Sequence, residues 1–317
     1  MAAHLVFGLD IGGTSTHGIR AEHNGQGWQV TREAWAGSAN LQNVSAVEAQ
    51  SALHDVARQL GFDRLPRGAA LRVVAGSGGV DTPEDVHRLQ SMITAAIRPP
   101  TTDSEPLSAH EYNMTVVHDT RLILAAGGTD AGVAVIAGTG SVAWGRTPEG
   151  REARRGGWGH LLGDEGSSWW IGREAVRRTL RRHDTGVTVD DLDQAILQAR
   201  NLTTRDQLIA DFHAHPSRTE WSDVARLVDQ CADQGHIEAG DLLSRAAEHL
   251  VTAARDVSTH LNIQGPVVAG GGLVQRSRHL QREFERCSEA AGLTPVKILQ
   301  VDPVMGALHL AERGGQP

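Results

Sequence analysis

The sequence predicts an α/β protein built from two halves that repeat one pattern of strands and loops. The first half opens with an apolar strand at residues 5–9, a glycine- and threonine-rich bend at 10–16, and a strand pair that turns at Asn24-Gly25. The second half repeats this order between residues 132 and 155. Because threonine and glycine recur at the first bend of both halves, the repeat indicates a duplicated domain rather than an array of short repeats.

Helices and further strands follow these hairpins in both halves. Apolar residues on one face predict a helix over 44–61, with Gly61 as its C-cap, and Thr82-Pro83 marks the start of another. Buried strands are expected at 71–75 and at 115–118. In the second half we expect helices at 168–182, 190–199 and 242–261, and strands at 266–269 and 295–299.

Composition excludes several classes of protein. The 317 residues are 40% hydrophobic and carry 30 basic against 38 acidic side chains, a net charge of −8, which argues against nucleic-acid binding. No apolar run approaches the roughly 18 residues of a membrane helix. Two cysteines, Cys231 and Cys287, suit a reducing compartment without disulfides. A cytoplasmic protein that does not bind membranes is expected.

Lysine is almost absent, which limits how the chain could bind nucleotides. Lys297 is the one lysine, and neither a P-loop nor a protein-kinase strand surrounds it. ATP would therefore be held by backbone amides and a metal ion.

The first bend has the composition of a phosphate-binding loop. Glycines let the chain approach a phosphate closely, and exposed N–H and hydroxyl groups donate to its oxygens. Asp10, at the end of the strand, is placed to hold Mg²⁺ through water. The alternative is an ordinary turn. The expected nucleotide-binding residues of this bend are Gly12, Gly13, Thr14 and Ser15.

The second bend, formed by Gly138, Thr139, Gly140 and Ser141, is a weaker signal by itself. Two such loops facing each other would clamp a polyphosphate from both sides. The pair therefore favours nucleotide binding more than either loop does.

Six sequence segments, in order, resemble the N-acetylglucosamine kinase and BadF/BadG/BcrA/BcrD-type ATPase family, within the actin-like sugar-kinase superfamily. The longest runs from Gly156 to Ser168 and is highly specific, and together the segments cover nearly the whole chain. The segments are 8–16, 118–119, 136–141, 156–168, 268–272 and 302–307.

The resemblance implies two ribonuclease H-like (actin-like ATPase) domains with a cleft between them. The expected domains are 1–118 and 119–302, with a last helix over 303–317 packing back onto the first. The run Gly270, Gly271 and Gly272 resembles the loop that receives adenosine, although a strand-to-helix turn would have the same composition.

Asp119 resembles the catalytic base of this family. Kinase chemistry requires a group that orients the attacking sugar hydroxyl and takes its proton. The alternative is a helix N-cap, since a helical stretch follows Asp119-Thr120.

The family's sugar-binding loops resemble residues 37–40, 76–78 and 158–167 of this chain. Asn40 would offer a donor and an acceptor, and Asp164 would accept from two hydroxyls. Turns are the alternative for the first two loops, and Trp169-Trp170 are expected to bury in the core. The expected sugar-binding residues are Asn40, Ser77, Asp119, Thr139, Trp158, Gly159 and Asp164.

The expected function is ATP- and Mg²⁺-dependent phosphorylation of an amino sugar, with N-acetylglucosamine and its O6 first. Glucosamine and glucose are alternative substrates, because one group in a pocket changes binding by only a few kcal/mol. An ATPase activator of a radical acyl-CoA dehydratase and a non-catalytic sugar sensor are the alternatives of other classes. The second-half helices would also permit a homodimer.

Overall fold

The computed structural model describes residues 4–62, 65, 70–97, 112–214 and 217–313. The chain divides into two compact units, residues 1–130 with 301–317, and residues 131–300. The first division falls after Asp130 and not after residue 118 as expected, because α3 (Asp119–Ala126) packs against the sheet of the first unit. The chain re-enters the first unit at Val301, and not after residue 302 as expected.

The first unit is a five-stranded sheet in the order β3-β2-β1-β4-β5. The first three strands form an antiparallel meander, and β1 also pairs in parallel with β4, which pairs in parallel with β5. Parallel β1 and β4 therefore end at the same edge of the sheet. The strands are β1 (His4–Ile11), β2 (Ser15–His23), β3 (Trp28–Gly37), β4 (Ala70–Ser77) and β5 (Tyr112–Val117).

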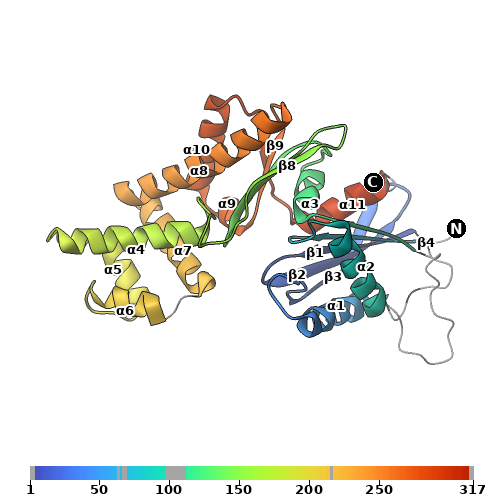
Figure 1. The fold of residues 1–317 in the computed structure, drawn as a ribbon, viewed down its shortest axis with the longest axis horizontal. Helices are drawn as coiled ribbons and strands as arrows, with labels where there is room; N and C mark the ends of the chain where they lie inside the picture. Colours follow the sequence, from blue (N-terminus) through green and yellow to red (C-terminus); the bar gives the residue numbers. More distant parts are fainter. Residues whose placement is uncertain (1–3, 63–64, 66–69, 98–111, 215–216, 314–317) are drawn as a thin grey trace. The chain divides into compact units, whose positions relative to one another are not determined.

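Helices cover both faces of this sheet (Figure 1). On one face lie α1 (Ala46–Leu60) and α2 (Pro83–Ile97), and on the other lie α3 and α11 (Gly306–Glu312), each pair over its own hydrophobic cluster. Glycine allows α11 to lie close to its neighbours: a Cβ at Gly8 would come within 2.7 Å of the Ala307 Cβ. The last helix thus packs against the first unit.

The second unit repeats the topology of the first. Its sheet has the order β8-β7-β6-β9-β10, so an antiparallel meander is again extended by two parallel strands. The identical order confirms the predicted duplication. The strands are β6 (Gly132–Ala137), β7 (Ser141–Arg146), β8 (Glu152–Gly156), β9 (Val267–Gly270) and β10 (Val296–Ile298).

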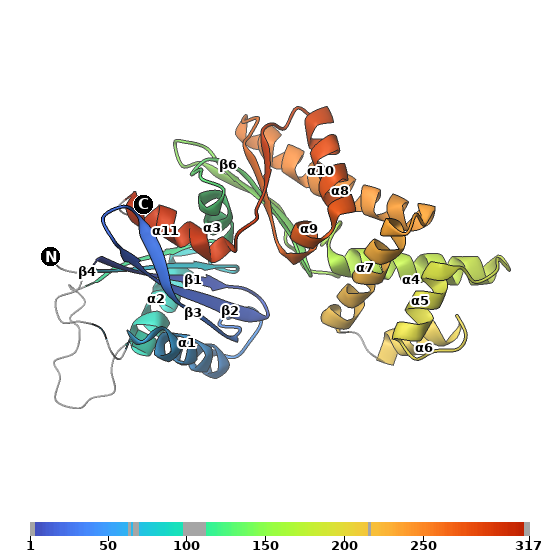
Figure 2. The ribbon, with the colours of Figure 1, turned by 180° about the vertical axis from the view of Figure 1, so that it is seen from behind.

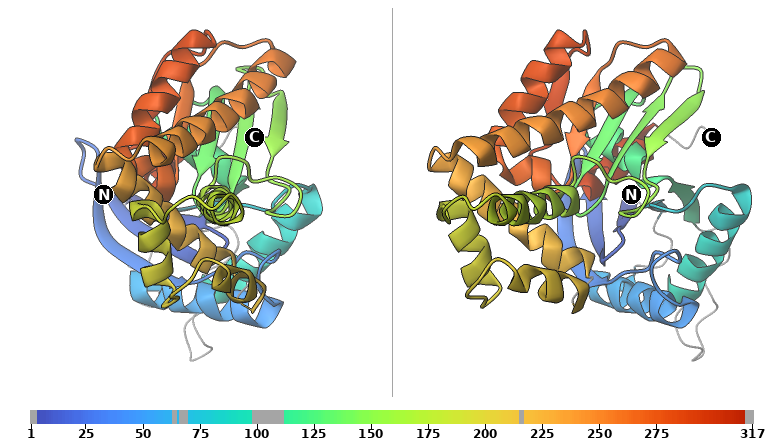
Figure 3. Two further views of the ribbon diagram at one scale, coloured as in Figure 1. Left: turned by 90° about the vertical axis from the view of Figure 1, so that its left-hand side faces the viewer. Right: turned by 60° about the vertical axis from the view of Figure 1, so that its left-hand side comes forward.

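Helix α8 (Ile237–Leu261) runs along the sheet of the second unit, where it packs against β6, β7 and β8 (Figure 3). A Cβ at Gly145 would come within 2.5 Å of Val257, so this glycine sets the closeness of α8 to the sheet. Helix α10 (Arg278–Ala290) lies beside α8 (Figure 2).

The remaining helices of this unit are α4 (Ser168–Asp184), α5 (Asp191–Ala199), α6 (Gln207–Ala214), α7 (Arg218–Asp233) and α9 (Gly272–Arg276). Trp169 and Trp170 are buried in the core, as predicted. Over the described part of the chain, no helix has both the length and the apolar character of a membrane span.

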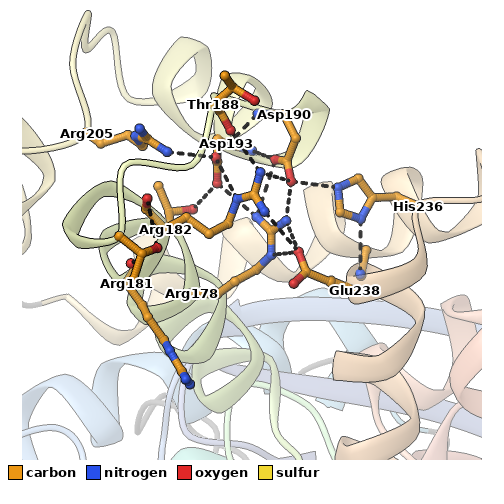
Figure 4. Close-up of polar contacts among 12 residues, drawn as sticks. Arg178, Arg181, Arg182, Thr188, Asp190, Asp193, Arg205, His236 and Glu238 are labelled. Carbon is orange, nitrogen blue, oxygen red and sulfur yellow. Dashed lines mark hydrogen bonds and ion pairs between the residues drawn. The ribbon is translucent and has the colours of Figure 1, made fainter.

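A buried ion-pair network joins α4, α5 and α8 (Figure 4). The Arg178 guanidinium donates to Asp190, Asp193 and Glu238, and its Nη1 lies 2.8 Å from Oδ1 of the fully buried Asp193. Arg182 also contacts Asp193. These contacts join the C-terminal half of α4 to the N-terminal ends of α5 and α8.

Candidate active site

The bend after β1 is held open by backbone and hydroxyl contacts. The Gly12 N–H donates to the Ser15 carbonyl at 2.9 Å, and Ser38 Oγ donates to the Gly12 carbonyl at 2.8 Å. Gly13, Thr14 and Ser15 are exposed. The bend predicted to bind phosphate therefore presents an exposed glycine and two exposed hydroxyl-bearing residues to a ligand.

Asp10 stands at the end of β1 in a strongly negative environment. Burial, together with the nearby carboxylates of Asp119 and Asp302, raises the pKa of Asp10 from its ordinary 3.8 to about 7. Three carboxyl groups from β1, α3 and the segment before η2 (Pro303–Met305) thus converge at one edge of the sheet.

This carboxylate group fits a hard divalent cation. Mg²⁺ takes oxygen ligands and keeps much of its water shell, and its charge would offset the repulsion that raises the pKa of Asp10. Asp10, Asp119 and Asp302 do not bring three oxygens within 4.8 Å of one another, so they could not all ligate one ion directly. The arrangement suits an ion held in part through water.

Asp119 is the first residue of α3, and His118 is the N-cap. The N-cap reading of Asp119 is therefore wrong, because the side chain of His118 accepts from the Thr120 N–H. Oδ1 of Asp119 is buried and has no hydrogen-bond partner. A buried carboxylate oxygen without a hydrogen-bond partner can accept a proton from a ligand.

Asn40 lies close to Asp119. A Cβ at Gly78, the residue after Ser77, would lie 3.0 Å from Asp119 Oδ2 and 3.5 Å from Asn40 Nδ2, so the side chains of Asp119 and Asn40 border the same small space. Asn40 and Ser77 are buried, and Asn40 Oδ1 accepts from the Gln42 N–H at 2.9 Å. The amide nitrogen of Asn40 and the Asp119 carboxylate therefore present a donor and an acceptor together.

A second polar group, not predicted from the sequence, lies next to Asp10 on the neighbouring strand β2. His17 is the cross-strand partner of Asp10; its Nε2 lies 2.8 Å from Glu33 Oε1, and its Nδ1 lies 3.8 Å from Asp302 Oδ2. The His17 ring also stacks on Trp35. His17 therefore lies next to Asp302, one of the three carboxyl groups near Asp10. From the sequence, residue 302 was assigned to the segment that starts the last helix, without a role in the site. No role was predicted for His17.

In the second unit, the two predicted nucleotide loops lie side by side. Gly271 has a φ of +104°, and a Cβ there would come within 2.6 Å of the Ala137 carbonyl oxygen. Strand β9 is parallel to β6, so both loops follow strand ends at the same edge. Gly138, Thr139 and Gly140 are therefore adjacent to Gly270, Gly271 and Gly272.

Asp164 is buried at the edge of the 138–141 loop. It adopts a left-handed backbone with φ of +61°, uncommon outside glycine. Its Oδ1 accepts from the Ser141 N–H at 3.2 Å, and its Oδ2 accepts from Arg218 Nη2 at 3.0 Å. Burial raises the pKa of Asp164, while the Ser141 N–H, Arg218 and His160 act to lower it.

Trp158 and Gly159 belong to the exposed loop that precedes Asp164. Trp158 is 60% exposed, and the Arg154 guanidinium lies 4.6 Å above its ring. Gly159 has a φ of +80° and open space around its Cβ position. An exposed indole and an open glycine suit contact with a ligand better than a role in the core.

The predicted residues thus gather into two groups, one in each unit. Arg218 joins the second group although no signal in the sequence pointed to it. The first group holds Asp10, Gly12, Gly13, Thr14, Ser15, Asn40, Ser77 and Asp119; the second holds Gly138, Thr139, Gly140, Trp158, Gly159, Asp164, Gly270, Gly271 and Gly272.

The chain belongs to the BadF/BadG/BcrA/BcrD ATPase family, whose model matches residues 7–311. It is 28% identical over 318 residues to an N-acetylmuramic acid/N-acetylglucosamine kinase of Clostridium acetobutylicum, covering 96% of this chain and 97% of that protein. It is 27% identical to an N-acetyl-D-glucosamine kinase of Dictyostelium discoideum, covering 98% of each.

Solved structures share the fold. An N-acetylglucosamine kinase candidate from Chromobacterium violaceum superposes with a TM-score of 0.72 at 24% identity, over 97% of this chain and 98% of that one. A ROK family glucokinase from Streptomyces griseus gives 0.57 at 15% identity, over 98% and 100%. The predicted fold class and the enzyme class, an ATP-dependent sugar kinase, are confirmed.

Proposed function

We propose that this protein transfers the γ-phosphoryl group of ATP to O6 of N-acetylglucosamine, with Asp119 as the general base. The observation that carries the proposal is the buried Oδ1 of Asp119, which has no hydrogen-bond partner and belongs to a carboxylate close to the amide of Asn40. Two relatives aligned over almost the whole chain are N-acetylglucosamine kinases by name.

Asp119 would accept the proton of the sugar hydroxyl as its oxygen attacks the γ-phosphorus. The new bond forms between that oxygen and phosphorus, the bond to the β,γ-bridging oxygen breaks, and ADP leaves with the electron pair. Asn40 would hold a hydroxyl or the acetamido group of the same sugar, so that the attacking oxygen stays near Asp119.

Asp10 is the residue that would hold Mg²⁺, with Asp119 and Asp302 as the surrounding carboxylates. When bound, the ion neutralises the phosphate charge that develops during transfer. The exposed groups of Gly13, Thr14 and Ser15 would donate to phosphate oxygens.

The second unit would bind both substrates with its adjacent loops. The 138–141 loop would bind phosphate, and Gly270–Gly272 would receive adenosine. The missing side chain at Gly271 lets this loop pack directly against the backbone of Ala137, beside the 138–141 loop. Asp164 would accept from sugar hydroxyls, because only two of its lone-pair positions are occupied by protein donors. Trp158 would pack on the C–H face of the pyranose.

N-acetylmuramic acid is a second candidate substrate. The Clostridium relative acts on both N-acetylmuramic acid and N-acetylglucosamine by name. Arg154 and Arg155 lie on the strand that leads to Trp158, and they would favour the carboxylate of the additional lactyl group.

An electron-transfer ATPase is less well supported. It would need thiolate ligands for an iron–sulfur cluster at a subunit contact. Cys231 is only 5% exposed in the core, and burial raises the pKa of both Cys231 and Cys287. A sugar sensor would not need a general base at Asp119.

The test is a coupled ADP-release assay with Mg·ATP and five sugars in parallel: N-acetylglucosamine, glucosamine, glucose, N-acetylmannosamine and N-acetylmuramic acid. We expect turnover with N-acetylglucosamine and none without sugar. Sugar-independent hydrolysis, or no turnover with any of the five, would overturn the proposal.

A further inference from the structure

The guanidinium of Arg218 lies where the sugar-binding and phosphate-binding residues of the second unit meet. A Cβ at Gly140 would lie 2.9 Å from Arg218 Nη2 and 3.0 Å from both carboxylate oxygens of Asp164. Arg218 thus contacts Asp164 directly at the loop expected to bind phosphate. This contact links α7 to residues that lie far away in the sequence.

The position of Arg218 is unfavourable for an arginine unless it has a specific partner. Arg218 is the first residue of α7, where the positive end of the helix dipole disfavours a cation. Its Nε is buried and has no hydrogen-bond partner. Within the described part of the chain, the guanidinium forms its ion pair with Asp164, whose side chain is 3% exposed. Both unfavourable features are explained if the role of Arg218 is to pair with the carboxylate of Asp164.

The position of the Asp164 carboxylate in turn depends on its hydrogen bond from Arg218. The left-handed backbone and the burial of Asp164 both cost free energy. Among the described residues, the Ser141 N–H and Arg218 Nη2 are the donors that hold its oxygens. His160 and Glu165 are the other charged groups that act on it. Without Arg218, one oxygen would lose its partner and the side chain could turn away from the loop.

We propose that Arg218 is a positioning residue for the sugar: it fixes the ionised carboxylate of Asp164 beside Gly140, so that the remaining lone pairs accept from sugar hydroxyls. This inference rests on the proposed kinase function. It assigns Arg218 no contact with the transferred phosphoryl group.

The test compares Arg218→Ala with Arg226→Ala, a control on the same helix whose exposed side chain pairs only with Asp223. We expect Arg218→Ala to raise the KM for sugar about ten- to a hundredfold, the range for a lost hydrogen bond to a charge, with little change in the KM for ATP. Arg218→Lys, which keeps the charge without the planar fork, should be intermediate. Arg226→Ala should match the wild type.

A double-mutant cycle identifies Asp164 as the group through which Arg218 acts. Adding Arg218→Ala to Asp164→Asn should raise the KM for sugar no further than Asp164→Asn alone. Additive effects, an equal rise in the KM for ATP, or a fall in kcat with both KM values unchanged would each overturn the inference. If Arg218→Ala does not fold, Arg218→Lys carries the same comparison.

Failure of the two proposals can be told apart in this experiment. No sugar-dependent ADP release from the wild-type protein overturns the kinase function and this inference with it. Normal turnover by the wild type and an unchanged KM for sugar in Arg218→Ala and Arg218→Lys overturns this inference alone.

Discussion

Oδ1 of Asp119 lies 2.9 Å from Nδ1 of His118, yet the two atoms do not form a hydrogen bond. Nδ1 of His118 lies 2.7 Å from Thr120 Oγ1, within the cap of α3. Nδ1 of His118 is therefore engaged in capping α3, and Oδ1 of Asp119 remains available to accept a hydrogen bond from a ligand.

The first prediction follows from that available oxygen. Asp119→Asn should keep the fold but lower kcat about a hundredfold or more, because an amide cannot take the sugar proton. Coupled ADP release measures kcat, and circular dichroism checks the fold. Glu84→Gln, an exposed carboxyl at the start of α2, is the control and should retain full activity. Near-normal turnover in a folded Asp119→Asn protein would show that another group is the base.

The sequence predicted the duplicated topology because the loops and strand lengths of each half are local features. The glycine-rich bends marked strand ends, and parallel pairing of β1 with β4 and of β6 with β9 then placed them at one edge of each sheet. The contacts of Arg218 and His17 could not be predicted in this way. Each joins residues that are distant in sequence, Arg218 to Asp164 and His17 to Asp302, so that only the folded chain brings them together. The domain boundary was misplaced for the same reason, because the packing of α3 is a tertiary contact.

The second prediction concerns Asp10 and pH. Its pKa is about 7 in the folded protein against an ordinary 3.8, so the folded state binds a proton that the unfolded state has released between these values. Stability therefore falls as pH rises through this window. Asp10→Asn should remove that loss and be more stable than the wild type at pH 8 by about 2–4 kcal/mol in the presence of a chelator.

Thermal unfolding of both proteins at pH 5 and pH 8 checks this prediction. The Tm difference should be larger at pH 8, and Mg²⁺ should raise the Tm of the wild type but not that of Asp10→Asn. Asp55→Asn, an exposed carboxyl of α1, serves as the control. Parallel pH dependence in the wild type and Asp10→Asn would contradict the raised pKa.

The third prediction compares two glycines of the 138–141 loop. Gly140→Ala should lower the Tm, because the added Cβ would lie 2.9 Å from Arg218 Nη2 and 3.0 Å from the Asp164 oxygens. Gly138→Ala should leave the Tm nearly unchanged, because the nearest atom is the Gly272 nitrogen at 4.0 Å. Differential scanning fluorimetry distinguishes them. Equal Tm values for the two variants would mean that the Arg218–Asp164 pair moves aside without cost.

The fourth prediction concerns the network around Arg178. Arg178→Ala should lower the free energy of unfolding by about 1–3 kcal/mol, because the fully buried Asp193 loses one charged partner at 2.8 Å but keeps Arg182 and Thr179. Arg181→Ala is the matched control: it lies one turn along the same helix, is exposed, and points away from the network (Figure 4). It should change stability little. Urea unfolding at pH 7 measures both variants.

The pH dependence of this loss provides an independent check. Burial acts to raise the pKa of Asp190, but the hydrogen bond from Arg178, the Asp193 N–H and the charge of Arg182 together lower it below its ordinary value. A carboxyl with a lowered pKa contributes stability above its unfolded pKa, near 4, and loses that contribution as pH falls further. The difference between the wild type and Arg178→Ala should therefore shrink as the pH is lowered from 7 to 3. A difference that stays constant over this range would mean that Arg178 stabilises the fold by packing and not by its charge.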